Sequence, residues 1–220
     1  MKITKYIHSC LVIEKDSDKI LFDPGLFTFA EGLVKPSQFQ NINAVIITHK
    51  HPDHIDGDSL KKILDENENA AVLANSDIVK TLAGKDIEAE VFESGARTVG
   101  SFSIEALDAP HEKILADELP QNTAYVIDGQ IIHPGDSYNK NLSERKGTPV
   151  LCLPTMAPWA TEIATYNFAV EMSPEYIVPI HDGYAKGFFL ESRYENFKKY
   201  FDAQNIKFQW MSNAGDYAEF

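Results

Sequence analysis

A short apolar run that passes directly into a group of histidines and aspartates constrains this chain more than any other feature. Residues 44–47 read Ala-Val-Ile-Ile, and such a run between polar residues is typical of a strand that is buried on both faces. The next ten residues include His49, His51, Asp53 and His54, which are metal-binding residue types. The strand should therefore lie inside the molecule, with its end at a cleft.

The spacing within this segment suits two metal ions rather than one. His49 and His51 are two residues apart, so in extended backbone they point to the same side and can bind one ion. Asp53 and His54 are adjacent and point in different directions unless the chain turns, which the proline and glycine of residues 48–57 favour. That geometry predicts a second ion beside the first.

Strands and helices alternate along the chain. Leu60, Ile63 and Leu64 share one helical face, so we expect a helix after the histidines, capped by Asp58 or Ser59. By the same patterns we expect three strands within residues 2–23 and a long loop at 26–41. Further strands are expected at 70–74, 87–92, 98–107, 123–127, 130–133, 150–153, 176–180 and 206–210, with turns at 94–97 and 128–129. The other expected helices are at 78–83, 161–172 and 191–202. This alternation predicts an α/β (α+β) layer architecture and one domain spanning residues 1–220.

Three later segments complete a recognisable set of motifs. They are Leu-Asp-Ala-Pro-His at residues 107–111, His-Pro-Gly-Asp-Ser at 133–137 and Ile-Val-Pro-Ile-His-Asp-Gly at 177–183. Together with the histidine segment they resemble the motifs of the metallo-β-lactamase superfamily. Residues 6–14 and 20–25 also resemble the branch of ascorbate-6-phosphate lactonases and uncharacterised metal-dependent hydrolases, although His8 follows Ile7 where that branch has a glycine. The resemblance implies a four-layer αββα sandwich.

The resemblance also implies a set of metal ligands. His49, His51 and His111 would bind one ion, and Asp136 would bridge it to the other. The second ion would be bound by Asp53, His54 and His181. Asp53 and Asp136 are accordingly the expected catalytic residues, and Asp53 is our candidate to orient the nucleophile and pass a proton to the leaving group.

Further residues are expected around the metals. His8 is expected to line the pocket or to be a hydrogen-bonded strand residue, and Asp23, at a strand end, should fix a ligand imidazole. Three other aspartates lie beside ligand segments and could fix ligand imidazoles in the same way: Asp56, Asp108 and Asp182. For Asp182, an ordinary turn residue is the favoured interpretation. Four aromatic side chains should form either a substrate wall or part of the core, and the core is slightly favoured. They are Trp159, Tyr184, Phe188 and Phe189.

Imidazole and carboxylate ligands without thiolates favour zinc, with manganese or iron as alternatives. Two such ions would provide a bridging hydroxide for hydrolysis of a small-molecule lactone, ester, amide or phosphodiester. The alternative is an oxidoreductase like the sulfur dioxygenases of the same fold, which hold a single iron. The number and identity of the bound ions distinguish the two.

Composition limits the partners and the compartment. The formal charge is −13, from 20 basic and 33 acidic residues, and scattered lysines and arginines argue against nucleic acid as a partner. The sequence contains no apolar run of about 20 residues, so we expect no membrane insertion and a cytoplasmic location. Cys10 and Cys152 lie in apolar strand-like runs and are expected to be core thiols. Oligomeric state stays open.

Overall fold

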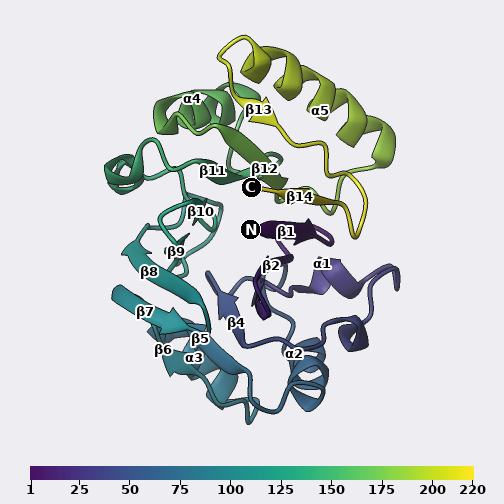
Figure 1. Cartoon of the computed structure of the whole chain (residues 1–220), viewed down its shortest axis with the longest axis vertical. Helices are drawn as coiled ribbons and strands as arrows, with labels where there is room; N and C mark the ends of the chain where they lie inside the picture. Colours follow the sequence, from purple (N-terminus) through teal and green to yellow (C-terminus); the bar gives the residue numbers. More distant parts are fainter.

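Two seven-stranded mixed sheets form the centre of the protein in the computed structural model, which describes residues 1–220 (Figure 1). The first sheet has the order β14 (Tyr217–Glu219), β1 (Lys2–Lys5), β2 (Leu11–Lys15), β3 (Asp18–Phe22), β4 (Ala44–Ile47), β5 (Ala71–Ala74) and β6 (Glu90–Val91). The second has the order β13 (Lys207–Phe208), β12 (Tyr176–Ile180), β11 (Val150–Pro154), β10 (Ile131–His133), β9 (Thr123–Ile127), β8 (Phe102–Asp108) and β7 (Gly95–Val99).

Helices cover the outer face of each sheet. The first sheet carries α1 (Leu26–Phe29), α2 (Gly57–Asp65) and α3 (Ser76–Ala83), and the second carries α4 (Glu162–Met172) and α5 (Gly187–Asp202) (Figure 1). Two 3₁₀ helices, Pro36–Gln38 and Lys140–Arg145, lie in connections. The four layers confirm the predicted αββα sandwich. None of the helices combines the length and apolar character that a membrane span requires.

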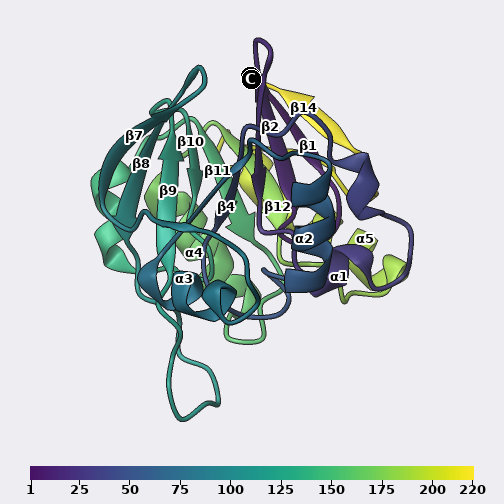
Figure 2. The same ribbon diagram turned by 90° about the horizontal axis from the view of Figure 1, so that it is seen from below.

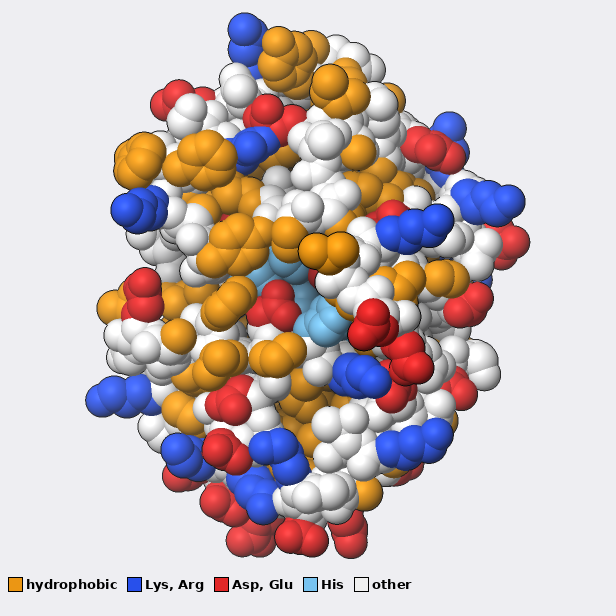
Figure 3. Space-filling model, turned by 180° about the vertical axis from the view of Figure 1, so that it is seen from behind, with side chains coloured by type: hydrophobic (Ala, Val, Ile, Leu, Met, Phe, Trp, Pro, Cys, Tyr) orange, Lys and Arg blue, Asp and Glu red, His pale blue; other side chains and the backbone are white.

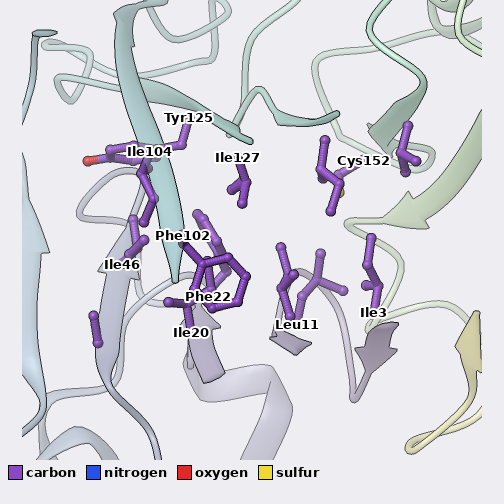
Figure 4. Packing of buried hydrophobic residues seen from close by; sticks show 14 of the residues in the cluster. Ile3, Leu11, Ile20, Phe22, Ile46, Phe102, Ile104, Tyr125, Ile127 and Cys152 are labelled. Carbon is purple, nitrogen blue, oxygen red and sulfur yellow. The ribbon is translucent and has the colours of Figure 1, made fainter. Parts of the chain in front are cut away.

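Apolar side chains fill three layers between these elements. Between the sheets, Ile3 and Leu11 from one side meet Ile104, Ile127 and Cys152 from the other (Figure 4). Two further clusters lie under the helices, one on each sheet. Both cysteines are buried and free, as expected from their apolar surroundings.

Strand β4 shows why its sequence is continuously apolar. Ala44 and Ile46 pack between the two sheets, whereas Val45 and Ile47 pack under the helices of the first sheet. Parallel neighbours flank it, β3 on one side and β5 on the other. A strand that is buried on both faces needs apolar residues at every position, so the sequence-based interpretation of this run is confirmed.

Several local predictions were wrong. Helix α2 is capped by the side chain of Asp56, which accepts from the Ser59 amide, and not by Asp58 or Ser59. The turn expected at 94–97 is strand β7, which pairs with β8, so the reversal falls after Val99. Strand β14 was not expected, because a three-residue exposed edge strand has no clear hydrophobic pattern. The predicted hairpin at 128–129 is present between β9 and β10.

A buried ionic cluster ties the two ends of the chain to the second sheet. Lys5 on β1 donates to the Asp182 carboxylate, to the Tyr194 hydroxyl at 3.0 Å and to the Met211 carbonyl at 3.1 Å. The Tyr194 hydroxyl on α5 also donates to Asp182. Burial lowers the pKa of Lys5 below its ordinary value, while Asp182 acts in the opposite direction. Asp182 is therefore more than the ordinary turn residue we expected.

Removing one charge from this cluster should destabilise the fold. Lys5→Met leaves the Asp182 carboxylate buried without a cation, and such losses cost about 3–5 kcal/mol. Urea unfolding measures the change. Lys2→Met is the matched control, because Lys2 lies on the same strand but its pair with Glu14 is partly exposed, so a change under about 1 kcal/mol is expected. Equal losses in both variants would contradict this role for Lys5.

Candidate metal centre

The histidines and aspartates predicted from the sequence meet at one edge of the sandwich. Asp23 follows β3, the segment from His49 to His54 follows β4, His111 follows β8, Asp136 follows β10, and His181 follows β12. The strands β3 and β4 run parallel, so their carboxyl ends lie at the same edge. Ligand sites in α/β sheets commonly lie beyond such strand ends. His8 enters from the turn between β1 and β2.

These side chains form two groups of four potential metal ligands. One group consists of His49, His51, His111 and Asp136, and the other of His8, Asp53, His54 and His181. Within each group, the ligand atoms lie within 4.8 Å of one another. The structure thus brings together all seven residues that were expected to bind metal, and it adds His8 to the second group.

Asp136 lies between the two groups. Its Oδ2 atom is 3.0 Å from His181 Nε2 and 3.6 Å from His111 Nε2, and its Oδ1 atom is 3.3 Å from His54 Nε2. One carboxylate therefore faces imidazoles of both groups. This is the position that a bridging ligand needs.

Neighbouring groups orient the ring nitrogens of three imidazoles. Asp23 Oδ2 accepts a hydrogen bond from His54 Nδ1 at 2.8 Å and another from the Thr48 hydroxyl at 2.8 Å. Since that hydroxyl donates to Asp23, it accepts from His49 Nδ1 at 3.0 Å. His111 Nδ1 donates to the Glu112 carbonyl. With Nδ1 bonded in this way, each of these three rings turns Nε2 toward the centre, as metal-binding histidines do.

The donor atoms that face the centre suit a cation. His54 Nε2, His111 Nε2 and Asp136 Oδ1 are buried and make no hydrogen bond. Burial lowers the pKa of His49 well below its ordinary value, so this imidazole is neutral. Burial alone would raise the pKa of Asp136, but His181 and His54 hold it well below its ordinary value. Imidazole nitrogens around a carboxylate are the ligands that zinc binds.

His8 has the opposite arrangement of its ring nitrogens. The backbone amide of Gly183 donates to His8 Nδ1 at 3.0 Å, so the neutral ring carries its proton on Nε2. That nitrogen lies 3.1 Å from Asp53 Oδ2 and donates to it. Burial lowers the pKa of His8 to about 4, which keeps the ring neutral. His8 therefore presents a proton to Asp53 rather than a lone pair to a metal.

Close backbone contacts hold the ligand segments together. A Cβ at Gly25 would lie 1.9 Å from the Asp53 carbonyl oxygen, so only glycine fits in this turn. His8, Asp23 and His181 all have positive φ angles, of 64°, 44° and 64°. Left-handed backbone is strained for these residue types and often marks functional sites.

One supporting residue was missed in the sequence. Asn122 is buried and donates to the carbonyls of Ala109 and Pro134, while its side-chain oxygen accepts from the Asp136 amide at 3.1 Å. It thereby fixes the turn that carries Asp136. No local pattern marks an asparagine whose partners lie more than ten residues away, so its role becomes visible only in the folded chain.

The aromatic side chains were predicted with mixed success. Trp159 donates from Nε1 to Asp136 Oδ2 at 3.1 Å and lines the pocket over the metal-binding groups. The favoured core placement was wrong for Tyr184, Phe188 and Phe189, which are all exposed. Of the other aspartates, Asp108 is exposed and makes no contact with the ligand imidazoles.

A family model described as a β-lactamase superfamily domain matches residues 2–181, which is most of the chain. The solved structure of Igni18, a metallo hydrolase from Ignicoccus hospitalis, has the same fold, with a TM-score of 0.74, 22% identity, and coverage of 100% of this chain and 98% of that one. This chain belongs to the metallo-β-lactamase superfamily. The expected resemblance is confirmed.

Members of the superfamily with similar sequences are named metal-dependent hydrolases. One from Pyrococcus abyssi is 30% identical and matches 79% of this chain and 81% of its own length. Another, from Bacillus velezensis, is 27% identical and matches 82% of this chain and 85% of its own length. These relatives, together with the His and Asp groups at the sheet edge, support the conclusion that this chain is a metal-dependent hydrolase.

The contacts of Asp23 predict a loss of metal affinity when its charge is removed. Asp23→Asn should weaken binding by about 10- to 100-fold, because the His54 ring loses the charged acceptor that orients it. Titration with zinc against a chelator measures the affinity. Asp108→Asn is the matched control and should bind as the wild type does. Indistinguishable affinities of the two variants would refute this role of Asp23.

The contacts of His8 predict a different result. His8→Ala should retain all bound metal and lower turnover by about tenfold, because Asp53 loses a hydrogen-bond donor. His8→Gln, whose amide can donate from a similar position, should recover part of the rate. Elemental analysis of both variants is the deciding measurement. Loss of one ion per chain in His8→Ala would instead make His8 a ligand.

Proposed function

We propose that this protein is a hydrolase that binds two divalent metal ions, zinc in preference to manganese or iron, and acts on a small-molecule lactone, ester, amide or phosphodiester. The observation that carries this proposal is the position of Asp136 between two sets of three ligands, His49, His51 and His111 on one side and Asp53, His54 and His181 on the other. When bound, the two ions would lower the pKa of a water molecule and polarise the carbonyl or phosphoryl group. Every ligand would come from the seven residues expected from the sequence.

The protein groups around the centre would perform separate tasks. Asp53 is partly exposed, so its carboxylate can reach both the centre and an incoming substrate. Burial raises the pKa of Asp53, but the hydrogen bond from His8 and the nearby histidines hold it below its ordinary value. An ionised Asp53 can orient a water molecule and take up its proton. Passing that proton to the leaving group would complete hydrolysis.

A small molecule is the substrate that suits the opening. The pocket over the centre has a volume of about 550 Å³ and is lined by His51, Asp53, Trp159 and the segment from Lys113 to Leu115. This is within the range of about 300–1,000 Å³ that is usual for small-molecule sites. The net charge of −13 argues against nucleic acid, which would need a basic surface.

The one-iron alternative is less well supported. Three histidines with one carboxylate could serve a single ion, but Asp53, His54 and His181 form a second set of ligands beside Asp136. The Oδ1 atom of Asp136 is 3.3 Å from His54 Nε2, and its Oδ2 atom is 3.0 Å from His181 Nε2. A single ion would leave buried imidazole nitrogens of the other group without a partner. We therefore favour two ions and hydrolysis over one iron and oxygen chemistry.

Metal content tests this proposal directly. The protein produced with zinc, manganese and iron available should contain about two ions per chain and hydrolyse members of a panel of lactones, esters and phosphodiesters. Asp136→Ala should hold one ion or fewer and lose hydrolysis, because both ions lose a shared ligand. Ser137→Ala, in the same turn, should keep both ions, since its hydroxyl donates to Pro110.

The opposite results are equally clear. Two ions and unchanged turnover in Asp136→Ala would refute the bridging role. A single iron in the wild type, with oxygen uptake in the presence of a thiol, would replace the hydrolase by the sulfur dioxygenase alternative.

A further inference from the structure

A groove lined mainly by apolar side chains opens beside the metal centre. Its volume is about 380 Å³, and its lining residues come from the loop before α4, the loop before α5 and the first turns of α5: Thr155, Met156, Ala157, Ala160, Tyr184, Ala185, Lys186, Phe188, Phe189 and Arg193. We refer to these residues as the aromatic groove. Hydrophobic side chains surround the histidine and acidic side chains in the middle of this face (Figure 3).

Packing of α5 does not account for the aromatic side chains in this groove. The helix buries Leu190, Tyr194, Phe197 and Phe201 against the second sheet. Phe188 lies outside that buried face and is 75% exposed. Neighbouring large apolar side chains in water are unfavourable, and such patches commonly mark ligand-binding surfaces.

The groove lies next to the metal pocket, although no residue lines both. Tyr184 lines the groove, and its ring centroid lies 5.7 Å from that of His8 and 6.0 Å from that of His181. In the loop before α4, Ala157 faces the groove while Trp159 faces the metal pocket. A molecule held at the centre can therefore extend past Tyr184 into the groove.

Charge and a second apolar wall indicate what occupies the groove. The Arg193 guanidinium is paired with Glu162 at 2.6 Å and also lies over the Phe189 ring, so its charge is already compensated. On another side of the metal pocket, Leu115 is fully exposed on the loop between β8 and β9, which projects beyond the sheets in Figure 2. Lys186, which also lines the groove, is exposed and unpaired, so the preference for an apolar group over a phosphate or sugar rests on the apolar side chains that make up most of the lining.

We propose that the substrate carries an extended apolar chain, which lies in the aromatic groove while its ester or lactone group lies at the metals. This inference rests on the proposed hydrolase function for the position of the reacting group. Burying one methylene completely strengthens binding by about fourfold, so a groove that covers one side of a chain should contribute about twofold per methylene.

Binding of straight-chain carboxylates tests the groove without requiring turnover. The zinc-loaded protein is titrated calorimetrically with butyrate, hexanoate, octanoate and decanoate, and the dissociation constant should fall by about fourfold for each added pair of methylenes. In the double variant Phe188→Ser, Phe189→Ser, decanoate should bind about tenfold more weakly. Tyr217→Ser is the control, because Tyr217 is similarly exposed on the distant strand β14, and it should bind as the wild type does.

The outcomes separate this inference from the proposed function. Affinities that do not depend on chain length would overturn the proposal that the aromatic groove binds an apolar chain. The same dependence of affinity on chain length in the double variant as in the wild type would also overturn it. Hydrolysis of short esters or lactones by the same protein would leave the proposed function standing in that case. Chain-dependent binding without hydrolysis of any lactone, ester, amide or phosphodiester would instead reject the hydrolase and keep the groove.

Discussion

The burial of imidazoles and carboxylates where the two sheets meet is the constraint on which the rest of this structure depends. His49, His54, His111, Asp136 and His181 are all buried at that edge, and polar groups removed from water are costly unless they have partners. Contacts with Thr48, Asp23 and the Glu112 carbonyl satisfy one nitrogen of three of the rings. The remaining nitrogens face one another, and a metal ion is the partner that would satisfy them together.

Assembly of this centre requires both halves of the chain. The first sheet contributes His8 and the segment after β4, while the second contributes His111, Asp136 and His181. The sheets are joined by the apolar layer between them and by the buried cluster of Lys5, Asp182 and Tyr194. Because Asp182 directly follows His181, the contacts that stabilise the fold also fix a proposed ligand. Metal binding should in turn stabilise the packing of the sheets, since the ligands come together only in the folded chain.

Chemistry and selectivity come from different parts of the molecule. The strand ends and their hydrogen-bonded side chains determine where the histidines and aspartates lie, whereas the loops beyond them form the walls of the opening. Trp159 contributes both to the centre and to the walls, because its Nε1 atom donates to Asp136 while its side chain lines the pocket. A shared fold thus leaves the choice of substrate to the loops. The exposed aromatic side chains at the start of α5 are the feature of these loops that the fold does not need.

Local patterns in the sequence determined much of this protein, and long-range packing decided the rest. The apolar run of β4, the alternation of strands and helices, and the spacing of His49, His51, Asp53 and His54 predicted an α/β architecture and the first ligand segment, because periodicity and turn residues act over a few positions. The αββα arrangement and the later ligand segments were implied by the resemblance of their motifs to those of the superfamily. The role of Asn122, the hydrogen bonds of His8 and the exposure of Phe188 were not predictable in this way. Each depends on groups from distant parts of the chain, such as Gly183 beside His8, 175 residues away. Such contacts exist only after both sheets have packed, so only the tertiary structure fixes which ring nitrogen faces the candidate metal centre and which side chains line the opening.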